Sequence, residues 1–136
     1  MFSGWNRLLL SSIVMFLVTG CGSSDQPELG QVYGTITMDD APLAGVEVLF
    51  GPKGARSSAG YTDAEGQYTL YYLAGVKGAV LGEHRVEVRT PIEDESDPET
   101  EANFVENIPP KYNSQSELTA VVKAGDNPID FNLKSN

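Results

Sequence analysis

The sequence contains a single cysteine, a single histidine and few basic residues. Cys21 has no second cysteine with which to form an intrachain disulfide. General acid–base catalysis by His84 would need a partner group and a pocket, and the sequence indicates neither, so we expect a structural or surface role. Nine Lys and Arg residues against nineteen Asp and Glu residues give a net charge of −10. Such an acidic chain repels nucleic acid, which is therefore not an expected partner.

The sequence also lacks a hydrophobic run long enough to cross a membrane. Residues 8–18 form an apolar segment of eleven residues, interrupted only by Ser11 and Ser12. As a helix this segment would span about half of a ~30 Å hydrocarbon core. The positive charge of Arg7 before it and the small residues after it are typical of a secretory signal peptide. We assign residues 1–20 to this signal peptide.

The signal peptide ends in Leu17-Val18-Thr19-Gly20-Cys21, which resembles the lipobox of bacterial lipoproteins. The resemblance implies that Cys21 is acylated on its sulfur, that the chain is cut before it, and that the new amino terminus is acylated as well. Residues 21–29 are small and polar, as expected of a flexible tether. Gly22 stands where an Asp often signals retention in the inner membrane, so we expect the periplasmic face of the outer membrane. The alternative is an ordinary signal peptide followed by a chance cysteine.

Residues 30–136 alternate between apolar and polar side chains in short segments separated by turns rich in Gly, Pro and Asp. Alternation of this kind predicts strands with one buried face. The predicted strands cover residues 30–38, 46–50, 57–62, 67–72, 84–90, 117–123 and 129–134. Seven short strands with frequent reversals predict an all-β domain, a seven-strand antiparallel β-sandwich.

The segment 60–70 is predicted to be a hairpin that sets the register of the sandwich. Asp63 can accept hydrogen bonds from the backbone just after it, and Gly66 can adopt a positive φ without a steric penalty. Residues 124–128 are predicted to form a turn and residues 73–82 a crossover loop. Residues 92–106 are highly acidic and have few core residues, which predicts a mobile loop.

The order of these motifs resembles that of the carboxypeptidase regulatory-like domains, which implies a transthyretin-like (prealbumin-like) seven-strand sandwich over residues 30–136. The motifs that carry this resemblance are residues 34–37, 42–50 and 61–70. The tail, in residues 110–113, 116–119 and 125–133, is similar to small lipoproteins of this type in planctomycete bacteria.

Two activities of related sandwiches are not supported by the residues. Transthyretin-like hydroxyisourate hydrolases use clustered His and Arg residues and a Tyr-Arg-Gly-Ser ending, whereas this sequence has His84 alone and ends in residues 133–136 as Leu-Lys-Ser-Asn. The B-type repeats of Gram-positive adhesins can form an isopeptide bond from a Lys on the first strand. The first predicted strand here, residues 31–38, has no Lys.

Carboxylates and tyrosines are the remaining candidates for binding chemistry. Asp63 and Glu65 could donate oxygens to Ca²⁺, although a calcium site takes six to eight oxygen ligands, and turn formation explains Asp63 equally well. The acidic loop at 92–106 could collect divalent cations or be a solvated loop. Exposed tyrosines can stack on sugar rings or dock a partner, or they can lie at the edge of the core; the sequence has Tyr33, Tyr61, Tyr68, Tyr71, Tyr72 and Tyr112.

These observations together predict a membrane-anchored, non-enzymatic lipoprotein of the bacterial cell envelope. Its β-sandwich would serve as an interaction or structural module, with membrane lipid bound through the acylated Cys21 and an envelope protein or glycan as partner. The alternative is a glycan- or calcium-binding module on the cell envelope. We expect no catalytic residues, no cofactor and no bound metal in the leading interpretation.

Overall fold

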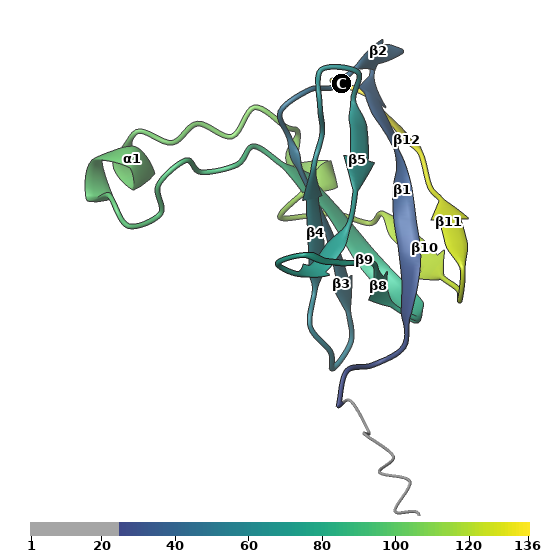
Figure 1. The fold of residues 1–136 in the computed structure, drawn as a ribbon. Coiled ribbons are helices and arrows are strands. Elements are labelled where there is room, and N and C mark those ends of the chain that lie inside the picture. Colours follow the sequence, from purple (N-terminus) through teal and green to yellow (C-terminus); the bar gives the residue numbers. More distant parts are fainter. Residues whose placement is uncertain (1–24) are drawn as a thin grey trace, which may run out of the picture.

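The computed structural model describes residues 25–136 of the chain. The predicted signal peptide and Cys21 lie outside the described residues. Among residues 25–136, no helix has the length and apolar character needed to cross a membrane. The described residues form two β-sheets that pack face to face, with one projecting arm (Figure 1).

The first sheet is built around one long strand, β1, Leu29–Met38. Its other strands are β2 (Ala41–Pro42), β5 (Gln67–Thr69), β8 (Ala79–Val80), β11 (Asp126–Pro128) and β12 (Phe131–Leu133), and each pairs with β1. The strand β1 can serve five partners because it is long and each partner covers only two or three of its residues.

The second sheet has the order β10-β9-β3-β4-β6-β7. Its strands are β3 (Glu47–Pro52), β4 (Ser58–Tyr61), β6 (Tyr71–Leu73), β7 (Val76–Lys77), β9 (Gly82–Arg89) and β10 (Thr119–Val122). All of its pairings are antiparallel. Two short helical segments complete the fold, α1 (Pro98–Ala102) and the 3-10 turn η1 (Pro110–Tyr112).

The core lies between the sheets and is made by the predicted inward faces of the strands. Alternate residues of β1, β3 and β9 are fully buried there: Val32, Ile36, Val48, Phe50, Val86 and Val88. Burying one such side chain stabilises the fold by about 1.5–3 kcal/mol. The ring of Phe50 meets Phe131 edge to face, with 6.3 Å between the ring centroids, so the two sheets are joined at the centre of the sandwich.

The prediction of an all-β chain with two packed sheets is confirmed, and two details of it need correction. The described residues form twelve strand segments, several of them only two residues long. In addition, β1 pairs in parallel with β11 and β12, so the first sheet is mixed. Residues 126–128, predicted as part of a turn, form β11 because the chain leaves the second sheet after β10 and then runs alongside β1 in the same direction. Alternation of side chains reveals a strand but not its direction relative to its partner.

The predicted hairpin at 60–70 is also corrected by the structure. Its turn forms as expected: Gly66 has φ of +75°, and Asp63 Oδ1 accepts hydrogen bonds from the N–H groups of Glu65 (3.0 Å) and Gln67 (2.9 Å). However, β4 pairs with β3 in the second sheet, whereas β5 pairs with β1 in the first sheet. The turn therefore carries the chain from one sheet to the other, and the two strands do not form a simple hairpin.

The segment 73–82, predicted as a crossover loop, contains β7 and β8. Glycine is required at one point of this crossover, because Gly78 has φ of +120° and a Cβ there would lie 2.7 Å from the carbonyl oxygen of Gly30. The close approach lets β8 pair with the first residues of β1.

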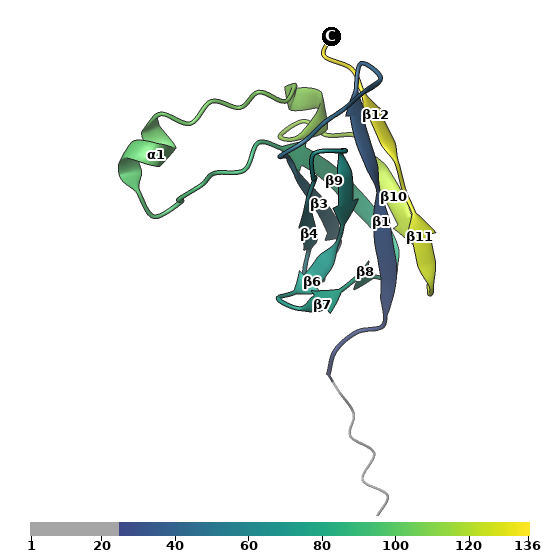
Figure 2. The same cartoon turned by 45° about the horizontal axis from the view of Figure 1, so that its top comes forward.

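Residues 91–105, here named the acidic arm, project sideways from the sandwich (Figures 1 and 2). The segment 92–106, predicted as a mobile loop, contains one short helix, α1. Asp97 caps this helix by accepting a hydrogen bond from the N–H of Glu99, and Pro98 occupies its first turn. No residue of α1 is buried, so local capping rather than core packing holds the helix.

Candidate functional site

The residues singled out for calcium binding do not gather into a site. One oxygen of the Asp63 carboxylate is engaged by the backbone of its own turn. Nowhere in residues 25–136 do three or more His, Cys, Asp or Glu side chains come together in a way that could hold a metal ion. The turn accounts for the position of Asp63, and most residues of the acidic arm are exposed.

His84 is a core residue, only 1% exposed. Its Nε2 lies 2.6 Å from the carbonyl oxygen of Val80, so Nε2 carries the proton and donates it to that oxygen. Its ring packs against Phe50, with 5.7 Å between the centroids. Among the described residues Nδ1 has no hydrogen-bond partner. The structural role predicted for His84 fits this position.

The six tyrosines differ in how far their side chains are exposed to solvent. Tyr68 is buried, Tyr72 and Tyr112 are half-buried, and Tyr33, Tyr61 and Tyr71 are exposed. The hydroxyl of Tyr61 reaches Glu47 on the neighbouring strand at 3.4 Å. Tyr33 differs from the other exposed tyrosines because it lines a cleft of about 450 Å³. We name this feature the Tyr33 cleft.

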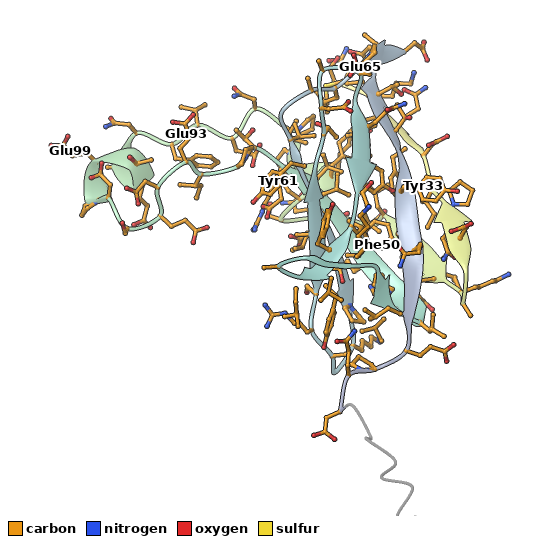
Figure 3. The ribbon with its side chains drawn as sticks, in the orientation of Figure 1. Tyr33, Phe50, Tyr61, Glu65, Glu93 and Glu99 are labelled. Atoms are coloured by element: carbon orange, nitrogen blue, oxygen red, sulfur yellow. The ribbon has the colours of Figure 1, made fainter. Side chains whose placement is uncertain are left out.

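The Tyr33 cleft lies on the outer face of the first sheet, on the side of the sandwich away from the acidic arm (Figure 3). It is lined by Tyr33, Gly34 and Thr35 of β1, Asp63 of the turn, Gln67, Tyr68 and Thr69 of β5, and Pro128 and Asp130 at the end of β11. The alternation of β1 places Tyr33 and Thr35 outward while Val32 and Ile36 enter the core. The same strand thus builds the core and the floor of the cleft.

Strand register brings the lining residues together. Tyr33 lies opposite Thr69 on β5 and opposite Pro128 on β11, and Thr35 lies opposite Gln67. The Tyr33 ring is therefore flanked on both sides, with polar side chains further along the strand. Because these residues stand on paired strands, their spacing is fixed by the sheet.

A glycine allows one wall of the cleft to form. A Cβ on Gly34 would lie 1.9 Å from the carbonyl oxygen of Ile129, so only glycine permits the approach of these two segments. Tyr68, opposite Gly34 on β5, donates a hydrogen bond of 2.6 Å to the same oxygen. Burial, with a smaller contribution from the charge of Asp130, raises the pKa of Tyr68 well above its usual value. The phenol therefore stays protonated and holds the segment between β11 and β12 in place.

Two carboxylates border the cleft in fixed orientations. Asp130 Oδ1 accepts a hydrogen bond of 2.7 Å from the N–H of Thr35, and Asp63 Oδ1 is held by its turn. Within residues 25–136 the second oxygen of each carboxylate has no hydrogen-bond partner. The side chains of Thr35, Gln67 and Thr69 add donors as well as acceptors between them.

The residues that line the cleft can make both ring and hydrogen-bond contacts with a bound molecule. No Cys, Ser, Lys or His is among the residues that line the cleft. The cleft offers one exposed ring and several polar groups held by the sheet. Sequence reasoning identified Tyr33 and Asp63 but missed Asp130 and Gln67. Gln67 was identifiable from the alternation of its strand, whereas Asp130 lies here only because β1 and β11 run parallel.

Comparison with known proteins identifies no family for the chain. No protein-family model and no curated protein sequence matches it. Among solved structures, a DUF3823 family protein from Parabacteroides merdae is similar over 80% of this chain and 46% of that one, with a TM-score of 0.40 and 13% sequence identity. The chain thus spans just under half the length of that protein.

Proposed function

We propose that this protein is a lipid-anchored, non-enzymatic module of the bacterial cell envelope. The observation that carries the proposal is the position of Cys21, directly after a short apolar segment and before a polar tether. One acyl chain anchors a protein only marginally, whereas two or three hold it firmly, because each buried CH₂ contributes about 0.8 kcal/mol. Membrane lipid would be bound through the acylated Cys21, at the periplasmic face of the outer membrane.

The arrangement of the sandwich supports a role in interaction. The described chain enters at one end, beside the start of β1, and its C-terminus lies at the opposite end (Figure 1). The Tyr33 cleft lies on the flank of β1 between these ends (Figure 3). A tether attached at the first end would leave the cleft and the acidic arm free to meet an envelope protein or glycan. We propose further that the sandwich is of the transthyretin-like, carboxypeptidase regulatory-like type.

The anchor is tested by replacing its attachment residue in the native host. Cys21→Ala should release the protein from the membrane fraction and abolish labelling by a fatty-acid probe, since no other thiol is present to form the thioether. Ser23→Ala, two residues further along, is the matched control and should keep both properties. Persistent membrane association of Cys21→Ala, at wild-type level, would exclude a lipid anchor at this residue.

The alternative function is binding of a glycan or of calcium, and the geometry supports a glycan better than calcium. For calcium, Asp63 and Glu65 belong to no group of three or more His, Cys, Asp or Glu side chains within residues 25–136. For a glycan, the Tyr33 cleft supplies a ring and fixed polar groups. Calorimetric titration with Ca²⁺ distinguishes the two, and we expect no heat of binding.

A further inference from the structure

The strongest unexplained feature of the surface is the exposure of Tyr33. The ring is 41% exposed although it stands at the middle of the longest strand, where a residue of the outer face could equally be small and polar. Tyrosine combines a flat apolar face with a polar tip. Such a ring on a rigid strand is a platform for a flat ligand that also makes hydrogen bonds.

The polar groups around the ring define what that ligand would be. A cation would be best served by acceptors alone, but the Tyr33 cleft mixes acceptors on Asp63 and Asp130 with donors on Thr35, Gln67 and Thr69. An anion is disfavoured, because no Lys, Arg or His of the described chain lines the cleft while two carboxylates do. Sugar hydroxyls both donate and accept hydrogen bonds, and they match this mixture.

We propose that the Tyr33 cleft binds a short neutral saccharide, with one sugar ring stacked on Tyr33. The carboxylate oxygens of Asp63 and Asp130 that have no partner within the described residues accept hydrogen bonds from the sugar hydroxyls, and the amide of Gln67 donates to those hydroxyls. The volume of about 450 Å³ falls within the range of roughly 300–1,000 Å³ found for small-ligand pockets. The inference deepens the proposed role as an interaction module but does not depend on the anchor at Cys21.

Preorganisation of the cleft favours binding. Asp130 is held by the backbone of Thr35, and Asp63 is held by its own turn, so neither carboxylate has to be ordered when a ligand arrives. The backbone of Tyr33 is paired on both sides, with Thr69 on β5 and Pro128 on β11. Side chains that are already fixed lose little conformational entropy on binding.

The test is titration of the full-length protein, in detergent micelles, with cellotriose, mannotriose and the neutral N,N′,N″-triacetylchitotriose at up to millimolar concentration. Saturation-transfer NMR and calorimetry report binding directly. At least one of the three should bind, and its affinity should change little with salt, because a neutral ligand carries no charge to screen. Failure of all three to bind overturns the proposal, and so does binding that disappears as salt is raised.

Variants of the ring locate the site. Tyr33→Ala and Tyr33→Leu should each weaken binding by about tenfold or more, which corresponds to about 1.4 kcal/mol. Tyr33→Phe keeps the flat ring and should bind nearly as well as the wild type. Tyr71→Ala is the control, because Tyr71 has the same 41% exposure but lies in the second sheet outside the cleft. Wild-type affinity in both folded Tyr33→Ala and Tyr33→Leu overturns the assignment.

The experiments distinguish failure of the proposed lipid anchor from failure of the proposed sugar site. Cys21→Ala should bind the same saccharide with unchanged affinity whether or not the anchor exists. Loss of saccharide binding in a folded Cys21→Ala protein would contradict the independence of the two features. If Cys21→Ala is released from the membrane but neither it nor the wild type binds a saccharide, the lipid anchor is supported and the sugar site is excluded.

Discussion

Single glycines decide where two segments of this chain can approach each other. Gly66 meets two demands at once: its φ of +75° favours glycine, and a Cβ there would lie 2.5 Å from the carbonyl oxygen of Ile36. Its own carbonyl accepts a hydrogen bond of 2.8 Å from the N–H of Ile36. The turn is therefore fastened to β1, and the residue contributes to packing as well as to turn geometry.

Replacing Gly66 by Val should destabilise the protein by about 2–4 kcal/mol, because positive φ and a backbone clash act together. Gly45→Ala is a matched control: Gly45 has φ of +70°, but a Cβ there meets nothing within 4 Å. That variant should lose only about 1–2 kcal/mol, the cost of the left-handed conformation alone. Urea unfolding measures both values, and equal losses for the two variants would contradict the role given to the clash.

Individual strands could be predicted from the sequence, but their partners could not. The inward faces of β3 and β9 follow from alternation, and Val48, Phe50, Val86 and Val88 are buried as expected. The turn at Asp63 was also predictable, since its chemistry is local. By contrast, the departure of β5 to the first sheet depends on the side-chain-free surface of Gly34, across which Tyr68 reaches Ile129. Such long-range fits leave no periodic signal in the sequence.

The candidate site, like the strand pairing, could be predicted from the sequence only in part. Tyr33 could be identified as an exposed tyrosine, but the sequence gives no reason to prefer it to Tyr61 or Tyr71. The preference arises from the β11–β12 segment, which brings Asp130 beside β1 from nearly a hundred residues away. The lipid attachment at Cys21 stays a prediction, because it lies outside the described residues.

The side chain of Glu106 links the two ends of the acidic arm at its base. Glu106 accepts hydrogen bonds from the N–H of Thr90 (3.1 Å), the hydroxyl of Thr90 (2.8 Å) and the N–H of Ile108 (2.8 Å). Thr90 directly precedes the arm, and Glu106 directly follows it. The carboxylate therefore closes the base of the arm.

Glu106→Ala should loosen the arm while leaving the sandwich folded. Backbone amides of residues 90–108 should exchange with deuterium faster, because three hydrogen bonds at the base are lost while the core strands are untouched. Glu101→Ala, on the exposed surface of α1, is the control and should leave exchange at the base unchanged. Hydrogen–deuterium exchange with mass spectrometry measures this, and unchanged exchange in Glu106→Ala would contradict the closing role.

The buried hydroxyl of Tyr68 makes the stability of the whole molecule depend on pH, because it takes part in the packing of the first sheet. Apart from His84 in the core, Tyr68 is the most deeply buried titratable side chain among the described residues, with 3% of its surface exposed. Its hydroxyl bonds the segment between β11 and β12 to β5. Ionising it would place a negative charge beside Asp130 in a chain of net charge −10. The fold and the acidity of the chain therefore both oppose ionisation of Tyr68.

Tyr68 should accordingly make the whole protein sensitive to alkali. The pKa of Tyr68 is raised in the folded state, so its stabilising effect is complete below the unfolded value of 10.0 and is lost as pH rises above it. Tyr68→Phe should cost about 1–3 kcal/mol at neutral pH, because the carbonyl of Ile129 loses its partner. The same variant should then lose less stability than the wild type above pH 10, so the two curves converge.

Urea unfolding at a series of pH values, with exposed Tyr71→Phe as the control, tests this convergence. The control should follow the wild-type curve throughout, since its ring is open to water. Parallel curves for wild type and Tyr68→Phe above pH 10 would mean that the phenol ionises as easily in the folded as in the unfolded chain. Convergence would show instead that the hydrogen bond holding the wall of the Tyr33 cleft is also what limits the stability of the molecule in alkali.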